Sequence, residues 1–431
     1  MGRSPVKNGN EKVKLLEAVS IGVGGMVGGG IFAVLGLAAD LAKGGTPVAF
    51  LFAGLIALLT ANSYAHLSKT YPDRGGTVRF VNEGYGRGLF SGGVNNLLWF
   101  SYVIMLSLYA SAFGSYGPNL LSISGDRTID SHILSSAVII LAAAINFYSL
   151  KIVSAIESYA VIFKLLILLV FIAIGVVGLA GNPNLVQLAP ENWSAPLSLF
   201  AAGMVIFVAY EGFELIANAA PDIENPQTNI PRSYYIAVIF VIALYLAIAV
   251  VTVGSLSFKS ISGAEDYVLA EAAKPMLGKA GFTAITVAAL VSTFSAINAS
   301  IYGGSRVSYE LAEDDELPHE FTRELWNKPV GLAVTAVATL VAVNTLNLES
   351  ISSAGSVGFL AIFAVVNSVA FKRADAIGGS RAIAIAGSVL CVGALMMLLV
   401  HTFNSSVFNF AVAIGLIVVC FAVEALYKRL R

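Results

Sequence analysis

The fold is decided by residues 18–39, AVSIGVGGMVGGGIFAVLGLAA, an uncharged stretch with glycine at 22, 24, 25, 28, 29 and 30. A helix needs about 20 apolar residues to cross the hydrocarbon core of a bilayer, so this stretch is long enough for one span. Each glycine weakens a helix interior by about 1 kcal/mol relative to alanine. The stretch therefore predicts a membrane span that is interrupted near Gly28, Gly29 and Gly30.

Two other interpretations of the glycines fit the sequence less well. Small residues at every fourth position also suit close packing between membrane helices, but this does not explain three glycines in succession. A phosphate-binding loop is excluded because no strand precedes the run and no Gly-Lys-Ser or Gly-Lys-Thr follows it. We favour the interruption, because broken helices in transporters expose backbone N–H groups that hold anionic substrate groups.

The composition of the whole chain agrees with a membrane protein. Of its 431 residues, 57% are hydrophobic and 12% are charged, whereas soluble domains carry about 25% charged residues. The net charge of -1 leaves no basic excess for binding nucleic acid. Cys391 and Cys420 lie in apolar runs, which predicts neither a disulfide framework nor a metal site. We expect no cofactor and no enzymatic activity, since no nucleophile is paired with a base.

Apolar stretches of spanning length recur along the chain, and the absence of short alternating segments favours helices over a barrel. The sequence predicts twelve spans: residues 18–39, 44–65, 89–125, 133–150, 158–180, 195–219, 233–258, 280–305, 329–348, 350–371, and two more between 382 and 423, separated by HTFNSS at 401–406. The sites of interest lie in the first, fifth, sixth and eighth of these spans.

The distribution of lysine and arginine predicts the orientation. With the N-terminus inside, most of the 25 lysines and arginines fall in cytoplasmic loops. The residues expected outside are Lys43, Arg127, Lys259, Lys274 and Lys279. Positive charge concentrates on the cytoplasmic side of membrane proteins, so both termini are expected in the cytoplasm. We find no removable signal peptide in the polar, basic N-terminus.

The sixth span contains two carboxylates, Glu211 and Glu214, on either side of Gly212. An ionisable residue at this depth costs several kcal/mol and is by default a functional candidate. For Glu214, the alternative is a structural hydrogen bond that pins an interruption of the helix. For Glu211, we expect the break to expose the backbone carbonyl, and we expect this carbonyl rather than the side chain to have the functional role.

Matching breaks in the first and sixth spans predict an all-α membrane protein with a 5+5 inverted repeat and a site between its halves. The expected parts are a cytoplasmic tail (1–14), the first five-helix repeat (15–180), the second (195–371), and two extra helices with a cytoplasmic C-terminus (381–431).

Lys164 lies deep in the fifth span, too far from its ends for the side chain to reach water. Burial lowers the pKa of a lysine, so this amine is a candidate for loading and releasing a proton near neutral pH. The alternative is a purely structural contact with helix-end carbonyls. In the eighth span, Ser292 and Ser295 share one face and could bond to a cation. They are weaker candidates than Lys164, because such hydroxyls often bond to carbonyls of their own helix.

Three motifs together resemble the amino acid/polyamine/organocation transporter superfamily, and most of all its proton-coupled amino acid permeases of the ApcT kind. They are GGGIF at 28–32, FVAYEGFE at 207–214 followed by ENP and IPR, and INASIYGGSRVSYELAEDDELP at 297–318. The resemblance covers essentially the whole chain.

The resemblance implies a substrate α-carboxylate held by the N–H groups of Gly29 and Gly30, and an α-ammonium held by carbonyls of Met26, Val208 and Glu211. It implies that Lys164 occupies the place of a sodium ion and faces the Gly24 carbonyl with Ser292 or Ser295. Val208 stands where the family often has an aromatic gate, which leaves Phe207 or Tyr210 as candidates for the gate.

The sequence thus predicts a secondary active transporter of the plasma membrane that takes up amino acids with protons by alternating access. The alternatives are an exchanger of amino acids or polyamines, and a nutrient receptor that does not transport. Sodium coupling is disfavoured, because a cationic lysine repels the ion from its site.

Overall fold

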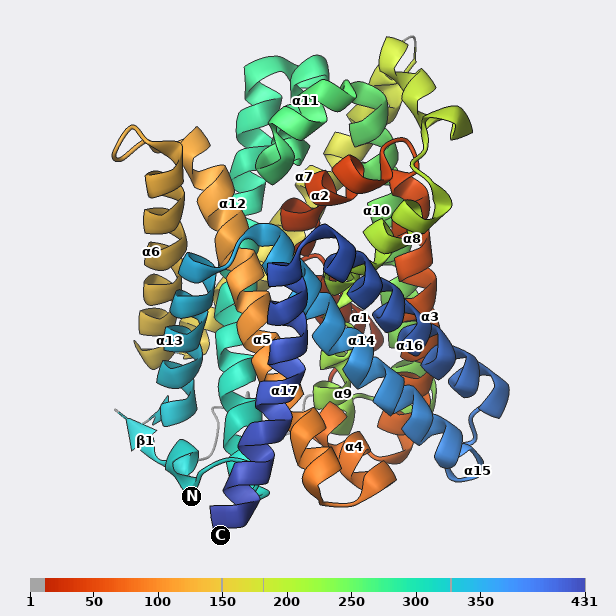
Figure 1. The fold of residues 1–431 in the computed structure, drawn as a ribbon, viewed down its shortest axis with the longest axis vertical. Coiled ribbons are helices and arrows are strands. Elements are labelled where there is room, and N and C mark those ends of the chain that lie inside the picture. Colours follow the sequence, from red (N-terminus) through yellow and green to blue (C-terminus); the bar gives the residue numbers. More distant parts are fainter. Residues whose placement is uncertain (1–11, 149, 181, 326–327, 431) are drawn as a thin grey trace.

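The structure is a computed structural model that describes residues 12–148, 150–180, 182–325 and 328–430. Most of the predicted N-terminal tail, residues 1–11, lies outside this range. The described chain is almost entirely helical (Figure 1). Its one sheet joins two short antiparallel strands, β1 (Glu324–Leu325) and β2 (Lys328–Pro329). The predicted all-α class is confirmed.

The α-helices, in chain order, are α1 (Leu15–Met26), α2 (Gly30–Ala42), α3 (Thr46–Thr70), α4 (Thr77–Tyr85), α5 (Leu89–Tyr116), α6 (Arg127–Tyr148), α7 (Leu150–Gly178), α8 (Pro196–Val205), α9 (Leu215–Ala219), α10 (Pro226–Ser255), α11 (Phe258–Gly263), α12 (Val268–Glu313), α13 (Val330–Thr345), α14 (Leu348–Lys372), α15 (Ala374–Ile377), α16 (Arg381–Ser405) and α17 (Val407–Leu430). Short 3-10 helices are η1 (Gly117–Asn119), η2 (Pro183–Leu188), η3 (Pro190–Asn192), η4 (Phe207–Tyr210), η5 (Ala220–Asp222), η6 (Glu265–Tyr267) and η7 (His319–Thr322).

Nine helices of the described residues are long and apolar enough to cross a membrane, or eleven if each of two bent pairs is one span. The helix α13 is apolar but shorter, with 16 residues. A count of twelve therefore stays a prediction, as do the boundaries of the two repeats. The break predicted at 401–406 is confirmed, because α16 ends at Ser405 and α17 begins at Val407.

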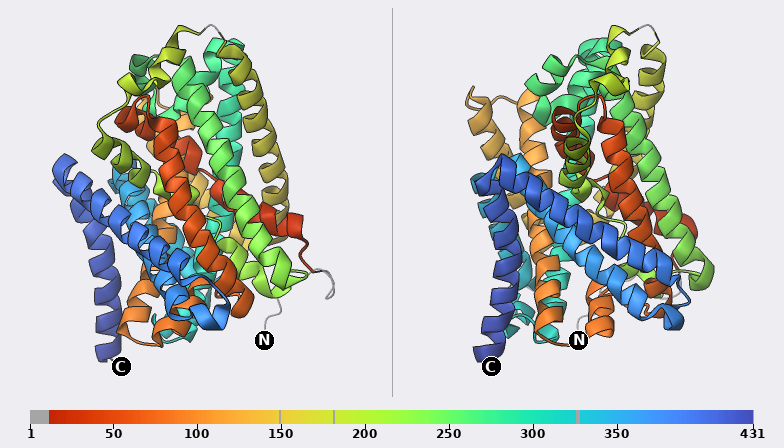
Figure 2. Two further views of the ribbon diagram at one scale, coloured as in Figure 1. Left: turned by 90° about the vertical axis from the view of Figure 1, so that its right-hand side faces the viewer. Right: turned by 45° about the vertical axis from the view of Figure 1, so that its right-hand side comes forward.

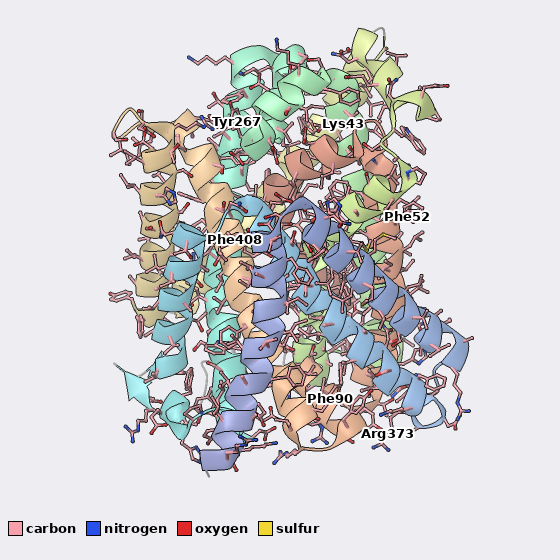
Figure 3. The ribbon with its side chains drawn as sticks, in the orientation of Figure 1. Lys43, Phe52, Phe90, Tyr267, Arg373 and Phe408 are labelled. Carbon is pink, nitrogen blue, oxygen red and sulfur yellow. The ribbon has the colours of Figure 1, made fainter. Side chains whose placement is uncertain are left out.

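Most of the long helices run upright between the two ends of one bundle, and α14 and α16 cross it at an angle (Figure 1). The α4 end carries α4, the two strands, α15 and the last turn of α17, and the opposite α11 end carries α11 and η2. Figure 2 shows α14 and α16 side by side and tilted, with α17 more upright. Figure 3 places Lys43 and Tyr267 toward the α11 end and Arg373 toward the α4 end. Both ends thus carry polar or charged side chains.

Both predicted interruptions are present. The helices α1 and α2 are bent by 48° across Val27, Gly28 and Gly29, and α8 is bent by 48° from the segment that holds η4 and α9. Continuous helix ends at Met26 and at Val205. Because the breaks lie in the first and sixth spans, they agree with two repeats of five helices.

A polar cluster at the α4 end joins α5 and α17 to the turn that follows α12. The Asn95 amide of α5 donates to Glu316 Oε2 (2.8 Å), and the Asn96 amide donates to Glu424 Oε2 of α17 (3.1 Å). Lys428 forms an ion pair with Glu424 at 3.0 Å. Glu316 is 2% exposed and lines a cavity of about 410 Å³ together with Arg87 and Lys428. Burial raises the pKa of Glu316 from its usual 4.5 to about 7.

We expect Glu316→Gln to make the protein more stable above pH 7 and to have little effect at pH 5. The folded state holds the Glu316 proton more tightly than the unfolded state, so its contribution to stability is complete below about pH 4.5 and is lost as the pH rises through about 7. Glutamine keeps an acceptor for Asn95 and cannot ionise. Thermal unfolding of the detergent-solubilised protein from pH 5 to 8 measures this, with the exposed Glu191→Gln as control. Parallel stability curves for wild type and Glu316→Gln would contradict the interpretation.

Candidate functional site

The break between α1 and α2 leaves backbone donors free inside the protein. The N–H groups of Gly29 and Gly30 donate to no acceptor among the described residues, although both glycines are buried. The Gly29 carbonyl is bonded, because it accepts from Ala33 N–H at 3.0 Å. Unpaired N–H groups at the start of a helix, where the helix dipole is positive, form a site for an anionic group such as a carboxylate.

The break in the sixth span packs directly on the break in the first. Gly212 has φ 119°, and a Cβ added there would overlap the backbone of Gly25 and Met26. A Cβ at Gly25 would lie 2.8 Å from the Gly212 carbonyl oxygen, and a Cβ at Gly30 would lie 2.9 Å from Ala209 Cα. Only glycine allows these two backbones to approach so closely. The two interruptions therefore form one site.

Neighbouring helices satisfy several of the peptide groups that the breaks release. The Tyr245 hydroxyl of α10 donates to the Met26 carbonyl (2.7 Å) and to the Ala209 carbonyl (3.1 Å), so it links the two breaks. Ser356 Oγ of α14 accepts from Val208 N–H at 3.0 Å and donates to the Val205 carbonyl at 2.9 Å. An unpaired buried polar group costs about 1–3 kcal/mol, so these side chains hold the broken helix together.

The Glu214 side chain pins the break in the sixth span. Its Oε2 accepts from Gly212 N–H at 2.8 Å, which is the structural interpretation that the sequence left open. Glu211 lies on the other side of Gly212, and its carboxyl is close enough to that of Glu214 for the two to share a hydrogen bond. No other group among the described residues donates to the Glu211 carboxyl. The two glutamates are 1% and 2% exposed.

The Lys164 amine reaches the first break from α7. Its Nζ donates to the Gly24 carbonyl at 3.0 Å, and the side chain is 1% exposed. The contact expected between this lysine and Gly24 is therefore present. Ser292 of α12 donates to the carbonyls of Gly28 and Val27, the latter at 3.2 Å, so it holds the first break from a third helix. Ser295 is buried nearby on the same helix.

The two aromatic residues considered as gates have other neighbours. Phe207 packs on Phe363 with ring centroids 5.9 Å apart, and the Tyr210 hydroxyl donates to the Phe50 carbonyl at 2.8 Å. Val208 is 2% exposed and faces Gly355, where an added Cβ would lie 3.0 Å from Val208 Cγ2.

An aromatic side chain that the sequence did not mark as a candidate lies against the first break. The ring of Tyr109, on α5, lies against Gly28 and Gly29, where an added Cβ at Gly28 would lie 3.3 Å from Tyr109 Cζ. Residues 89–125 contain three tyrosines, Tyr102, Tyr109 and Tyr116, and no feature of the sequence distinguishes Tyr109 as the one that reaches the glycines.

Comparison with known proteins agrees with this geometry. The family model described as amino acid permease matches residues 13–428. The chain belongs to the amino acid permease family. Membership confirms the superfamily to which the motifs pointed and indicates a multi-pass membrane transporter of amino acids.

Three relatives show how far the similarity extends. An uncharacterised protein of Methanocaldococcus jannaschii is 34% identical over 97% of this chain and 96% of its own length. The inner membrane transport protein YbaT of Escherichia coli is 34% identical over 91% of this chain and 89% of its own. The serine/threonine exchanger SteT of Bacillus subtilis is 27% identical over 72% of this chain and 70% of its own.

We expect Gly212→Ala to lower the thermal stability of the permease and to abolish substrate binding. Alanine is strained at φ 119°, and its methyl group overlaps the backbone of Gly25 and Met26, so the two breaks must separate. The matched control is Gly415→Ala in α17, where an added Cβ meets no atom within 4 Å. Melting temperature and ligand-induced thermal shift measure both effects. A Gly212→Ala protein that melts and binds like the control would mean that the close approach is not required.

Proposed function

We propose that this permease is a secondary active transporter that takes up amino acids together with protons across the plasma membrane, with both termini in the cytoplasm. The observation that carries the proposal is the contact of the Lys164 amine with the Gly24 carbonyl (3.0 Å). A titratable cation thus touches the same break whose Gly29 and Gly30 N–H groups are free. Proton binding and substrate binding therefore act on one short segment of backbone.

The substrate carboxylate binds at the N–H groups of Gly29 and Gly30 in this proposal. Its ammonium faces the carbonyls of Met26, Val208 and Glu211. A carbonyl oxygen has two lone pairs, so Met26 can receive the ammonium while it accepts from Tyr245. Tyr109 is the side chain that closes over the bound molecule, because its ring already contacts Gly28 and Gly29. Ser292 of α12 holds the segment through a hydrogen bond to the Gly28 carbonyl.

Coupling requires that the proton stabilise one state of the transporter more than another. A protonated Lys164 ties α7 to α1 through a charge-assisted hydrogen bond, which is about twice as strong as a neutral one. Loss of the proton weakens this bond and lets the first break move away from α7. The moving part is the bundle of spans one, two, six and seven, which comprises α1 to α3 and α8 to α10. It rocks against the remaining helices around the substrate.

Exchange of one amino acid for another is the second candidate, and the similarity to the serine/threonine exchanger SteT favours it. Counterflow in proteoliposomes separates the two mechanisms. Obligatory exchange requires amino acid inside the vesicle, whereas symport is driven by an inward proton gradient into empty vesicles. A nutrient receptor would bind amino acids and show no saturable flux in either assay. Replacement of sodium by choline tests for sodium coupling.

We expect Lys164→Ala to abolish amino acid accumulation driven by a proton gradient while counterflow at equal pH persists. The substitution removes the titratable cation and leaves the Gly29 and Gly30 N–H groups in place. Uptake into proteoliposomes with and without an inward proton gradient measures this, and Lys164→Gln serves as a second variant that keeps a hydrogen-bond donor. The control is Lys259→Ala, an exposed lysine at the α11 end. Accumulation by Lys164→Ala at the wild-type level would refute the coupling role.

A further inference from the structure

The carboxyl groups of Glu211 and Glu214 lie buried in the sixth-span break. The proposed transport mechanism assigns no role to the side chain of Glu211. Glu211 and Glu214 are 1% and 2% exposed. Glu214 Oε2 accepts from Gly212 N–H, and the carboxyl groups of Glu211 and Glu214 are close enough to share a hydrogen bond. No other group among the described residues donates to Glu214 Oε1 or to either oxygen of Glu211. Buried carboxyl oxygens are normally bonded, because leaving them unpaired is costly. A hydrogen bond between the two carboxyl groups engages one oxygen of each, so the second Glu211 oxygen has an open place for a donor.

The side chains that pack on this break from other helices are aromatic. Tyr64 of α3 and Tyr234 of α10 lie on Phe213 with ring centroids 5.5 and 6.3 Å apart, and the Tyr245 hydroxyl of α10 donates to the Ala209 carbonyl. From α1, the break is met by the backbone of Gly25 and Met26. From α14, Phe363 packs on Phe213 with centroids 5.2 Å apart. Two carboxyl groups that share one proton carry one negative charge, and neutral aromatic rings, hydroxyls and backbone do not offset it. A cationic ligand group is therefore the natural partner for the open oxygen of Glu211.

Glu211 lies in the backbone segment that packs on the break with the free N–H groups. Gly30 packs on Ala209, two residues before Glu211, and Gly212, the residue after Glu211, touches the backbone of Gly25 and Met26. An α-amino acid carries its carboxylate and its ammonium on one carbon. A carboxylate at Gly29 and Gly30 therefore directs the ammonium toward the break that contains Glu211.

We propose that the carboxylate of Glu211 binds the ammonium group of the transported amino acid directly and makes a free amine the main determinant of substrate affinity. The inference rests on the proposed function, since it assigns a side chain to the same substrate site. A charge-assisted hydrogen bond to the carboxylate is stronger than one to a backbone carbonyl. Glu214 has the separate task of fixing Gly212, so the two neighbouring glutamates divide binding and structure between them.

The test compares ligands that differ in one charged group. The probes are the twenty proteinogenic L-amino acids, and, for the one that binds wild type most tightly, the amine that lacks its carboxyl and the acid that lacks its amino group. We expect Glu211→Gln to weaken binding of the amino acid and of the amine at least tenfold, which is about 1.4 kcal/mol. Binding of the acid without an amino group should change less than twofold. Equilibrium binding to the purified protein gives these ratios.

The matched control is Glu316→Gln, the same substitution at a buried glutamate at the α4 end, which should leave all three affinities unchanged. Glu211→Asp keeps the charge, so it should retain the preference for the amine at a weaker affinity. It also keeps the test decisive if the glutamine variant does not fold. Unchanged amino acid affinity in Glu211→Gln, or an equal loss for all three probes, would overturn the proposal. Such a result leaves amino acid transport intact, whereas a wild type that binds none of the twenty amino acids refutes the proposed function itself.

Discussion

A peptide group inside a membrane must find a hydrogen-bond partner, and this constraint governs the centre of the permease. Continuous helix satisfies the constraint within each span, but the first and sixth spans are interrupted. Side chains from other helices compensate, among them Tyr245 and Ser356 for the sixth-span segment and Ser292 for the first. The N–H groups of Gly29 and Gly30 are among the donors that find no acceptor in the described residues. The proposed substrate site thus uses peptide groups that the rest of the described protein leaves unpaired.

Close backbone contact makes the two breaks respond together. Gly25 and Gly212 touch without side chains between them. Because the two backbones are close-packed, one segment cannot move toward the other without displacing it. Gly24 faces Val161 of α7, on the side of the Lys164 amine, while Gly25 faces the sixth span. The first break therefore lies between a titratable cation on one helix and two carboxyl groups on another. This arrangement suits a transporter, because a change of charge on either side acts on the backbone that we propose binds the substrate.

The membrane spans and the first interruption were predictable because they depend on the local amino-acid composition. Spans follow from apolar length, and the interruption near Gly28 follows from the low helix propensity of consecutive glycines. The roles of Gly29, Gly30 and Lys164 were drawn from the resemblance to the family, and the structure shows free N–H groups and a Gly24 contact where those roles need them. Tyr109 and Tyr245 were not predictable. A tyrosine in an apolar run looks the same whether it faces lipid, a neighbouring helix or a substrate.

The sequence by itself determined that this chain is an all-helical membrane protein with weak points in its first and sixth spans, because apolar length and glycine content act locally along the chain. It also marked Lys164, Glu211 and Glu214, since charge in an apolar stretch is conspicuous. Only the tertiary structure decided which peptide groups stay free, which glutamate is bonded and which tyrosine covers the glycines. These depend on contacts between helices far apart in the sequence, such as α10 with α1, and no local pattern records which faces of two helices will meet.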